Sequence, residues 1–250
     1  MHGKATGCRE GGRKMPSFLK DTRIFAGTGE RNKRGQTLQE FLEEYDPYKY
    51  KTPSCTTDAV IFSYRGEITE GLKGLKVLLI RRGDHPSIGW WALPGGFVNL
   101  EENLEDTARR ELEEETGVKG LVMEQIGTFG DYDRDPRTRV ITTAYMALTE
   151  EGKLKVKAGD DAADAAWCEV SWKLAHTRQQ GEETRKCYEL KLDNVEKGVS
   201  ARAVVEERLR GTIVRERKLE VVSRDQIAGD HAAIIMQALL TLDGRLREPL

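Results

Sequence analysis

The sequence is poor in the residues that bind zinc or form disulfides. It contains four cysteines, Cys8, Cys55, Cys168 and Cys187, and no two of them form a C-x-x-C pair. Its four histidines show no H-E-x-x-H or comparable spacing. We therefore expect neither a zinc site nor a disulfide framework, and we interpret the cysteines as reduced, partly buried small apolar residues.

Long hydrophobic runs are also missing. The longest candidates, such as AAIIMQALLTL near the C-terminus, fall well short of the ~20 residues of a membrane-spanning helix. The N-terminal stretch MHGKATGCREGGRK is rich in Gly, Lys and Arg and lacks the apolar core of a signal peptide. We expect a cytoplasmic protein without a membrane partner, whose N-terminal end is disordered.

The chain lacks an excess of either charge. It has 40 Lys and Arg residues against 42 Asp and Glu residues, a formal net charge of −2. This balance gives no general attraction to nucleic acid, and no basic recognition helix is visible, so no nucleic-acid partner is expected. Hydrophobic residues make up 38% of the chain and charged residues 33%, which supports an ordinary core under a heavily charged surface.

Residue periodicity predicts both strands and helices in the first 150 residues. Thr37 and Glu40 have the spacing of a capping box, which predicts a short helix over residues 37–45 that Pro47 ends. Alternating and β-branched residues predict four strands. They cover CTTDAVIFSYR (55–65), LKVLLIRRG (75–83), LVMEQIGTFG (121–130) and RVITTAYMAL (139–148), and DHPSIGWWALPGG (84–96) is predicted as a loop.

The last third of the chain is predicted to continue as strands and to end in a helix. KCYELKL, VSARAVVEERL and TIVRERKLEVVS have the pattern of strands with hairpin turns, although ARAVVEERLR also fits a helical period. Residues 225–246 show the clearest helical pattern. His231 lies on this apolar helix, where a packed or capping histidine is more common than a catalytic one.

An unusual group of carboxylates lies at the end of a predicted helix that starts near Asn103 and stops at Gly117. At about 100° per residue, Glu111, Glu114 and Glu115 share one side of this helix. The C-terminal half of a helix carries negative partial charge, and like charges four residues apart repel each other. Because the grouping works against helix stability, it indicates a functional site.

Clustered carboxylate oxygens suit a hard divalent cation, Mg²⁺ or Mn²⁺. The run Pro94–Gly96 brings bare backbone close to the helix, so a glycine carbonyl can supply one more oxygen ligand. Arg110 can orient a neighbouring carboxylate, and Glu102 can pair with Arg110 or reach the metal through water. Judged on charge alone, a run such as RRELEEE is more often a solvated helix face.

The spacing of the whole segment is more specific than its charge. From Gly96 to Val118 it reads G-x5-E-x7-R-E-U-x-E-E-x-G-U, where U is aliphatic. This matches the Nudix signature at all nine fixed positions, so the chain resembles the Nudix hydrolases. The resemblance implies an α/β (α+β) fold, a Nudix α/β/α sandwich with a mixed β-sheet, over residues 52–175. Residues 1–51 are then expected to be an N-terminal extension, partly disordered with a short helix. Residues 176–250 are expected to be a C-terminal strand-and-helix extension that packs on the domain or forms a dimer interface.

The same resemblance implies roles for the carboxylates. The expected metal ligands for Mg²⁺ or Mn²⁺ are Glu111, Glu114, Glu115 and the carbonyl oxygen of Gly96. The expected catalytic set is Glu111, Glu114, Arg110 and Glu102. Nudix enzymes cleave a diphosphate linked to another group, and their divalent cations neutralise developing charge while a carboxylate accepts the proton of the attacking water.

Flanking segments bear on the substrate. At a strand end only one of Arg81 and Arg82 can face the site, and we favour Arg82. The run RDPR-x-RV, residues 134–140, resembles ADP-ribose pyrophosphatases and related Nudix domains of NAD metabolism, which implies hydrolysis of ADP-ribose to AMP and ribose 5-phosphate. The expected substrate-binding residues are Arg82, Arg134, Asp135, Arg137 and Arg139. An internally salt-bridged surface turn explains the same arginines and aspartates equally well.

Two further segments resemble the same group of proteins. In the acidic loop AGDDAADAAW, residues 158–167, Asp160 or Asp161 would be an auxiliary base or metal ligand, and a simple polar turn is an equally good explanation. The segment GDHAAIIMQALLTLDGRL resembles the end of the Nudix-like domain in bacterial regulators that sense ADP-ribose. Those regulators continue into a winged helix that binds DNA and often carry damaged signatures, whereas this signature is intact and the chain stops at Leu250.

We therefore expect an enzyme rather than a regulator. Two alternatives stay open: an ADP-ribose-sensing Nudix-like regulator without its DNA-binding module, and a Nudix pyrophosphatase for another substrate, such as a nucleotide sugar, a dinucleotide or a pterin triphosphate. Because Nudix enzymes of the ADP-ribose group are often homodimers, a homodimer is also expected.

Overall fold

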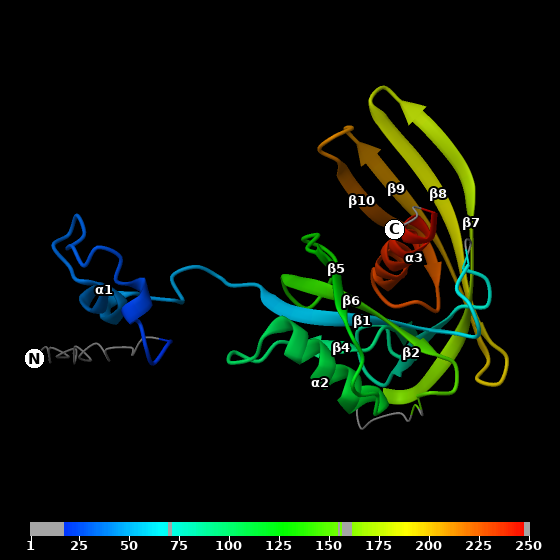
Figure 1. Cartoon of the computed structure of the whole chain (residues 1–250), viewed down its shortest axis with the longest axis horizontal. Coiled ribbons are helices and arrows are strands. Elements are labelled where there is room, and N and C mark those ends of the chain that lie inside the picture. Colours follow the sequence, from blue (N-terminus) through cyan, green and yellow to red (C-terminus); the bar gives the residue numbers. More distant parts are fainter. Residues whose placement is uncertain (1–17, 70–71, 155, 157–161, 248–250) are drawn as a thin grey trace, which may run out of the picture. The chain divides into compact units, whose positions relative to one another are not determined.

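The computed structural model describes residues 18–69, 72–154, 156 and 162–247. The chain divides into two compact units, Met1–Thr52 and Pro53–Leu250, and Figure 1 shows the whole chain coloured along its sequence. The calls for a disordered N-terminal end and for the aspartates at positions 160 and 161 fall on residues outside this description.

The first unit contains the predicted short helix. A 3-10 turn, η1 (Arg23–Phe25), precedes helix α1 (Leu38–Glu44). The backbone N–H of Glu40 donates to the hydroxyl of Thr37, and the N–H of Thr37 donates to the Glu40 carboxylate. This reciprocal pair is the predicted capping box, and it fixes the first turn of α1.

The second unit contains ten strands and two helices in the described residues. In chain order they are β1 (Ser54–Tyr64), β2 (Lys76–Arg82), β3 (Trp91–Ala92), β4 (Gly95–Phe97), α2 (Leu104–Thr116), β5 (Glu124–Phe129), β6 (Val140–Glu150), β7 (Ala162–Gln180), β8 (Glu183–Asn194), β9 (Val199–Arg210), β10 (Glu216–Asp225) and α3 (His231–Arg247).

One mixed sheet organises this unit. Its strands follow the order β10-β9-β8-β7-β2-β1-β6-β5, and the short strands β3 and β4 pair with β2 and β1. β1 and β6 are parallel, and the other pairs are antiparallel. β1 and β2 lie at the centre, which explains why their sequences are nearly continuous apolar runs.

Helices α2 and α3 cover opposite faces of the central strands (Figure 1). Successive residues of a strand point to opposite faces. Val60 and Phe62 of β1 therefore belong to the core cluster that contains Ile235 of α3, whereas Ile61 packs in a separate cluster with Leu112 of α2. The larger cluster also includes residues of β8 and β9, so α3 joins the central sheet to the long C-terminal strands.

Three local expectations need correction. The segment 84–96, predicted as a loop, contains β3 and β4, because its backbone pairs with β2 and β1. ARAVVEERLR lies in β9, where alternate residues are buried, so the helical alternative is wrong. Helix α3 begins at His231 rather than at Asp225, since Asp225 ends β10 and the residues that follow form hydrogen bonds with the backbone of Trp91.

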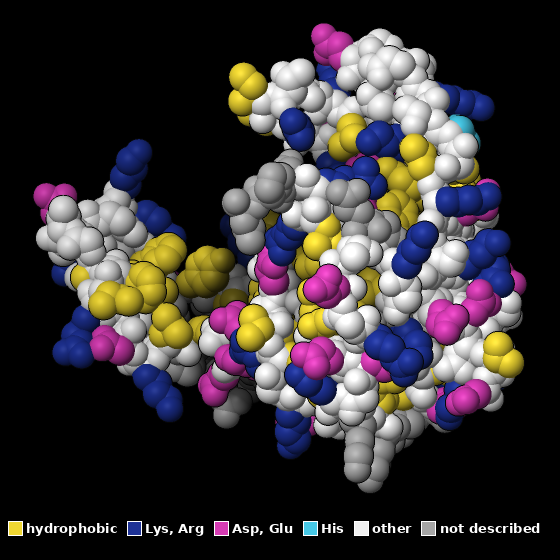
Figure 2. Space-filling view, turned by 45° about the vertical axis from the view of Figure 1, so that its right-hand side comes forward, with side chains coloured by type: hydrophobic (Ala, Val, Ile, Leu, Met, Phe, Trp, Pro, Cys, Tyr) yellow, Lys and Arg dark blue, Asp and Glu magenta, His cyan; other side chains and the backbone are white. Residues whose placement is uncertain are grey.

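The surface agrees with the balanced composition. Lys and Arg side chains alternate with Asp and Glu side chains over the face shown in Figure 2. Of the cysteines in the described residues, Cys55 is exposed, Cys168 buried and Cys187 half-buried, and all three are free thiols. In the same residues, no helix has both the length and the apolar content needed to cross a membrane.

Candidate active site

Helix α2 holds the signature carboxylates at the boundary between core and surface. Asn103 occupies the N-cap in an extended conformation, and Gly117 ends the helix in the left-handed region with a φ of 73°. Leu112 is buried against the sheet. The helix period then leaves Glu111 and Glu115, which lie about one turn apart on the same side of the helix, half-buried at the edge of the sheet.

Two glycines let the backbone before α2 touch these carboxylates. β4 pairs with β1 and places Gly96 opposite Thr57. A Cβ atom at Gly96 would lie 2.3 Å from the Glu111 carboxylate, which is far inside contact distance. A Cβ atom at Gly95 would lie 2.1 Å from the carbonyl oxygen of Thr57. Glycine is therefore required here by the close approach of neighbouring groups.

The guanidinium of Arg110 joins the acidic side chains to one another. It donates hydrogen bonds to Glu102, Glu111 and Glu114 at 2.9, 2.6 and 3.0 Å, and to the carbonyl oxygen of Phe97 at 3.1 Å. The hydrogen bond from Arg110 lowers the pKa of Glu102 to about 2. Burial raises the pKa of Glu111, and Arg110 opposes that rise. Arg110 thus fixes the direction of the carboxylates.

Glu115 lies deeper than the other acidic residues of α2. Its carboxylate accepts a hydrogen bond from the backbone N–H of Gly95 at 2.8 Å. Burial raises the pKa of Glu115 to about 8, and the negative charges of Glu111 and Asp58 add to this effect. The Gly95 hydrogen bond and the charge of Arg82 act in the opposite direction. A cation beside Glu115 would favour its ionised form.

The donor set fits a divalent cation of the Mg²⁺ type. Carboxylate oxygens of Glu111 and Glu115 lie beside the Gly95–Gly96 backbone, and hard oxygen ligands of this kind suit Mg²⁺ and Mn²⁺. The Glu111 carboxylate occupies the space that a Cβ atom at position 96 would fill, so glycine lets the backbone and the carboxylate approach each other here. Within the part of the chain that the structure describes, no three Asp, Glu, His or Cys side chains converge in the geometry of a completed metal site. The hydrogen bonds of Arg110 direct the Glu111 and Glu114 carboxylates toward the guanidinium.

A buried polar network forms the opposite wall. Arg134 donates two hydrogen bonds of 2.8 Å to the carboxylate of Asp230, and its guanidinium lies 3.8 Å from Asp58. Asp58 also accepts a hydrogen bond of 2.7 Å from the hydroxyl of Thr142. Arg134 is the buried cation between two carboxylates, so its partners satisfy it within the fold.

His231 connects this wall to the glycine loop. Its Nδ1 accepts a hydrogen bond of 2.8 Å from the backbone N–H of Leu93, two residues before Gly95. An accepting Nδ1 leaves the ring proton of a neutral imidazole on Nε2, which lies 4.0 Å from Asp58. The side chain therefore holds the start of α3 against the segment that carries the glycines.

These groups enclose one cavity of about 880 Å³. The expected site residues that line it are Gly96, Arg110, Glu111, Glu115, Arg82, Arg134, Asp135 and Arg137. Three other expected residues, Glu102, Glu114 and Arg139, do not line it, although Arg110 contacts the first two. Asp160 and Asp161 lie outside the described residues.

The expected substrate-binding side chains differ in how they are engaged. Arg82 donates a hydrogen bond of 2.6 Å to the carbonyl oxygen of Pro86 and lines the cavity. Arg137 pairs with Asp135 at 2.8 Å inside its own loop, as the surface-turn alternative describes. The hydrogen bond with Arg137 lowers the pKa of Asp135. Arg139 is exposed.

Comparison with known proteins decides the family. A family model described as the NUDIX domain matches residues 41–188, more than half of the chain. The chain belongs to the Nudix family. Its mixed sheet with few helices agrees with a Nudix fold that carries a C-terminal extension.

Three Nudix relatives show how far the similarity reaches. The chain is 42% identical over 112 residues to the ADPR responsive transcriptional repressor NtrR of Acinetobacter baylyi, which covers 44% of this chain and 42% of the repressor. It is 41% identical over 136 residues to the ADP-ribose pyrophosphatase of Methanocaldococcus jannaschii, which covers 53% of this chain and 73% of that enzyme. A MutT/nudix family protein from Enterococcus faecalis, known from its crystal structure, is 34% identical to this chain, with a TM-score of 0.58. The match covers 84% of this chain and 70% of the Enterococcus chain. The chain thus spans less than half of the repressor's length.

Sequence reasoning missed part of this Nudix cavity. Asp58, Asp230 and His231 line it, and none of them was expected there. A single acidic residue in the otherwise apolar strand β1 was the available signal for Asp58. The signal for His231 was its place at the start of an apolar helix, which favours packing over chemistry when taken alone.

Proposed function

We propose that this protein hydrolyses ADP-ribose to AMP and ribose 5-phosphate, with Mg²⁺ or Mn²⁺ as cofactor. The observation that carries the proposal is the packing of Glu111 and Glu115 against the backbone of Gly95 and Gly96, in a cavity that Arg82 also lines. The 41% identity to the pyrophosphatase of M. jannaschii supports the choice of substrate.

In this proposal the cation is held by Glu111, Glu114, Glu115 and the carbonyl oxygen of Gly96. A divalent ion bound there would supply neutralisation of charge on the diphosphate and would make an attacking water more acidic. Glu114 is the most exposed of the three carboxylates, with 58% of its side chain accessible, and Arg110 is its partner.

The protein's own side chains supply position and proton transfer. Arg110 orients Glu111, and burial raises the pKa of Glu111, so its carboxylate accepts a proton more readily than an exposed glutamate would. Arg82 directs positive charge into the cavity, where it can contact a phosphate. Most of the expected acceleration then comes from orientation and electrostatics.

A substrate panel tests the proposal. Purified protein is assayed with ADP-ribose, NADH, UDP-glucose and diadenosine polyphosphates in the presence of Mg²⁺, and products are separated by chromatography. We expect the highest kcat/KM for ADP-ribose, with AMP and ribose 5-phosphate as products, and loss of turnover in excess EDTA. Equal turnover in EDTA would contradict the mechanism, and strong activity on a different member alone would contradict the substrate.

A second candidate function is binding of ADP-ribose without hydrolysis. It is favoured by the 42% identity to a repressor whose name describes a response to ADPR. Both candidates require a bound ligand in the same cavity, so binding alone does not separate them. Calorimetry that shows tight ADP-ribose binding, beside an assay that shows no product after long incubation with Mg²⁺, would support the sensor.

A further inference from the structure

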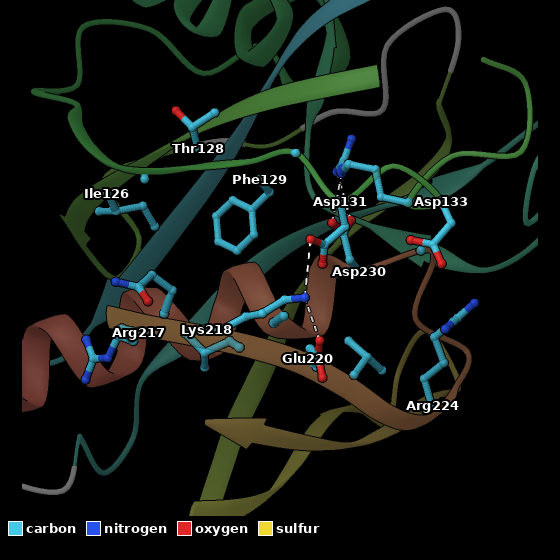
Figure 3. Close-up of a pocket in the computed structure, with 18 residues that line it drawn as sticks. Ile126, Thr128, Phe129, Asp131, Asp133, Arg217, Lys218, Glu220, Arg224 and Asp230 are labelled. Carbon is cyan, nitrogen blue, oxygen red and sulfur yellow. Dashed lines mark hydrogen bonds and ion pairs between the residues drawn. The ribbon is translucent and has the colours of Figure 1, made fainter. Parts of the chain in front are cut away.

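A second cavity, of about 560 Å³, lies beside the catalytic one. Its walls come from β5 and the loop after it, from β10 and from the first half of α3, and Figure 3 shows these side chains. We name it the β10 compartment. Ligand pockets in proteins commonly measure about 300–1,000 Å³, so the compartment has room for a substantial part of a small molecule.

The compartment adjoins the catalytic cavity, because the two cavities share part of their walls. The residues that line both are Asp133, Arg134, Arg224, Gly229 and Asp230. Arg134 and Asp230 form the hydrogen-bonded pair described above, and both line the two cavities where they meet. A ligand that extends from the carboxylates of α2 past this pair would reach the β10 compartment.

Among the described residues that line the compartment, the basic side chains of β10 other than Arg224 are already paired with carboxylates. Arg217 donates to Glu207 at 2.6 Å, and Lys218 pairs with Glu220 at 2.6 Å and with Asp131 at 3.4 Å. Figure 3 shows Lys218 between its two carboxylate partners.

The guanidinium of Arg224, by contrast, forms no hydrogen bond or ion pair with the residues that the structure describes. A phosphate next to the junction can therefore pair with Arg224 without displacing an internal partner.

The inner wall suits a flat group with a polar edge. Ile126, Phe129, Leu219, Val221 and Ala233 provide apolar and aromatic surface. Gln237 of α3 also lines the compartment, and its side-chain amide makes no hydrogen bond within the described residues. An amide offers both a donor and an acceptor, which is the pairing that reads the edge of a purine, and aromatic surface stacks on bases.

We propose that the β10 compartment binds the nucleobase of the nucleotide substrate, with Arg224 at the junction beside the adjacent phosphate. This inference rests on the proposed function, because it extends the same ligand from the catalytic carboxylates into the second cavity. Strand β10 would then determine specificity: it supplies Leu219 and Val221 to the base and Arg224 to the phosphate.

Adjacent valines of β10 provide a matched test. Val221 lines the compartment, whereas Val222 is 63% exposed and does not. We compare Val221→Trp with Val222→Trp by calorimetric titration with AMP and with ribose 5-phosphate, which lacks the base. In the unaltered protein AMP should bind at least about tenfold more tightly than ribose 5-phosphate, since stacking of the base on aromatic and apolar surface adds to the affinity. Val221→Trp should remove that difference and leave the affinity for ribose 5-phosphate within twofold, and Val222→Trp should change neither.

A second pair of variants covers the case in which Val221→Trp does not fold. Gln237→Leu removes the amide from the compartment, and Gln180→Leu makes the same change on the exposed end of β7. Gln237→Leu should weaken AMP binding about tenfold and reduce the preference for AMP over UMP, and Gln180→Leu should have no effect.

Three results would overturn the assignment. The first is equal affinity of the unaltered protein for AMP and ribose 5-phosphate, and the second is unchanged AMP affinity in folded Val221→Trp or Gln237→Leu. The third is a variant in which the affinities for AMP and for ribose 5-phosphate fall by the same factor. Failure of the proposed hydrolysis would appear separately, as absence of product from ADP-ribose with Mg²⁺. The AMP titrations do not depend on turnover and remain decisive in that case.

Discussion

At the scale of single residues, two neighbouring glutamates of α2 allow an effect on catalysis to be distinguished from an effect on stability. Glu114 is exposed and on the side of the proposed metal, whereas Glu113 is exposed on the other side and pairs with Lys119 at the helix end. We expect Glu114→Gln to lower kcat for ADP-ribose about a hundredfold or more, because a proposed metal ligand and candidate base is lost. Glu113→Gln should keep kcat within twofold. Both should melt near the temperature of the unaltered protein, and a similar loss of kcat in the two variants would contradict the assignment.

The two nitrogens of His231 can be tested one at a time. The side-chain oxygen of Asn occupies nearly the position of Nδ1, whereas the amide of Gln reaches the position of Nε2. His231→Asn should therefore keep the hydrogen bond from Leu93, and His231→Gln should leave that N–H without a partner, at a cost of about 1–3 kcal/mol. We expect unfolding in urea to show this order of stability, and kcat to fall further in His231→Gln. The opposite order would show that the Nε2 side matters more than the link to the glycine loop.

The raised pKa of Glu115 leads us to expect an unusual dependence of stability on pH. Its pKa rises from 4.5 to about 8 on folding, so the folded protein binds this proton more tightly than the unfolded chain. The stability that the proton contributes is complete below about pH 4.5 and is lost as pH rises through about 8. In EDTA, the free energy of unfolding should fall across this window, and Glu115→Gln should flatten the fall. Mg²⁺ should stabilise the unaltered protein at pH 8 and have much less effect on Glu115→Gln.

The sequence could predict the grouping of site residues that lie close together in the chain. The α2 carboxylates, Arg110 and Gly96 could be placed together because one helix and one turn determine their separation. Asp58 and His231 are far apart in the chain, and the cavity unites them only through strand pairing and the packing of α3. Such non-local neighbours depend on sheet register, which periodicity alone does not encode.

At the scale of elements, a buried polar triad ties the C-terminal strands to one another. Glu207 of β9 is 1% exposed and accepts hydrogen bonds from Tyr188 of β8 at 3.0 Å and from Arg217 of β10 at 2.6 Å. Arg217→Met leaves the carboxylate buried without its cation. Because Arg217 itself is about a third exposed, we expect the free energy of unfolding to fall by about 3 kcal/mol, which is the lower end of the range for broken buried ion pairs. The double change Arg217→Met with Glu207→Leu should recover most of it in urea unfolding, and a larger loss in the double variant would contradict this account.

The same strands show where periodicity stops being sufficient. Alternating burial in β9 agrees with the predicted strand, yet its residues also fitted a helical period, and only pairing with β8 and β10 removes the ambiguity. The start of α3 was misplaced for a related reason. Residues 226–228 have a helical pattern in sequence, but hydrogen bonds with the backbone of Trp91 hold them beside β3. Long-range backbone pairing outweighs local propensity in both segments.

At the scale of the whole molecule, α3 is the element on which both cavities and the larger core cluster depend. It supplies Ile234, Ile235 and Leu239, each fully buried, to the cluster formed by β1, β2, β8 and β9. Burial of each such side chain contributes about 1.5–3 kcal/mol. Because a domain is stable by only about 5–15 kcal/mol, loss of α3 and its partner strands exceeds what the remaining core can offset.

Truncation therefore tests the predicted domain boundary at residue 175. Every described residue that lines the catalytic cavity falls within Pro53–Leu250, so a chain of residues 53–250 should unfold cooperatively and hydrolyse ADP-ribose at close to the full rate. A chain of residues 53–175 lacks α3 and β8–β10, and with them the wall that carries Asp230 and His231. We expect it to show no cooperative thermal transition and no Mg²⁺-dependent stabilisation. If the shorter chain instead melts cooperatively and gains stability with Mg²⁺, the strands and helix after residue 175 are an appendage to the Nudix domain. The signature carboxylates of α2 would then need only the central sheet to hold them in place.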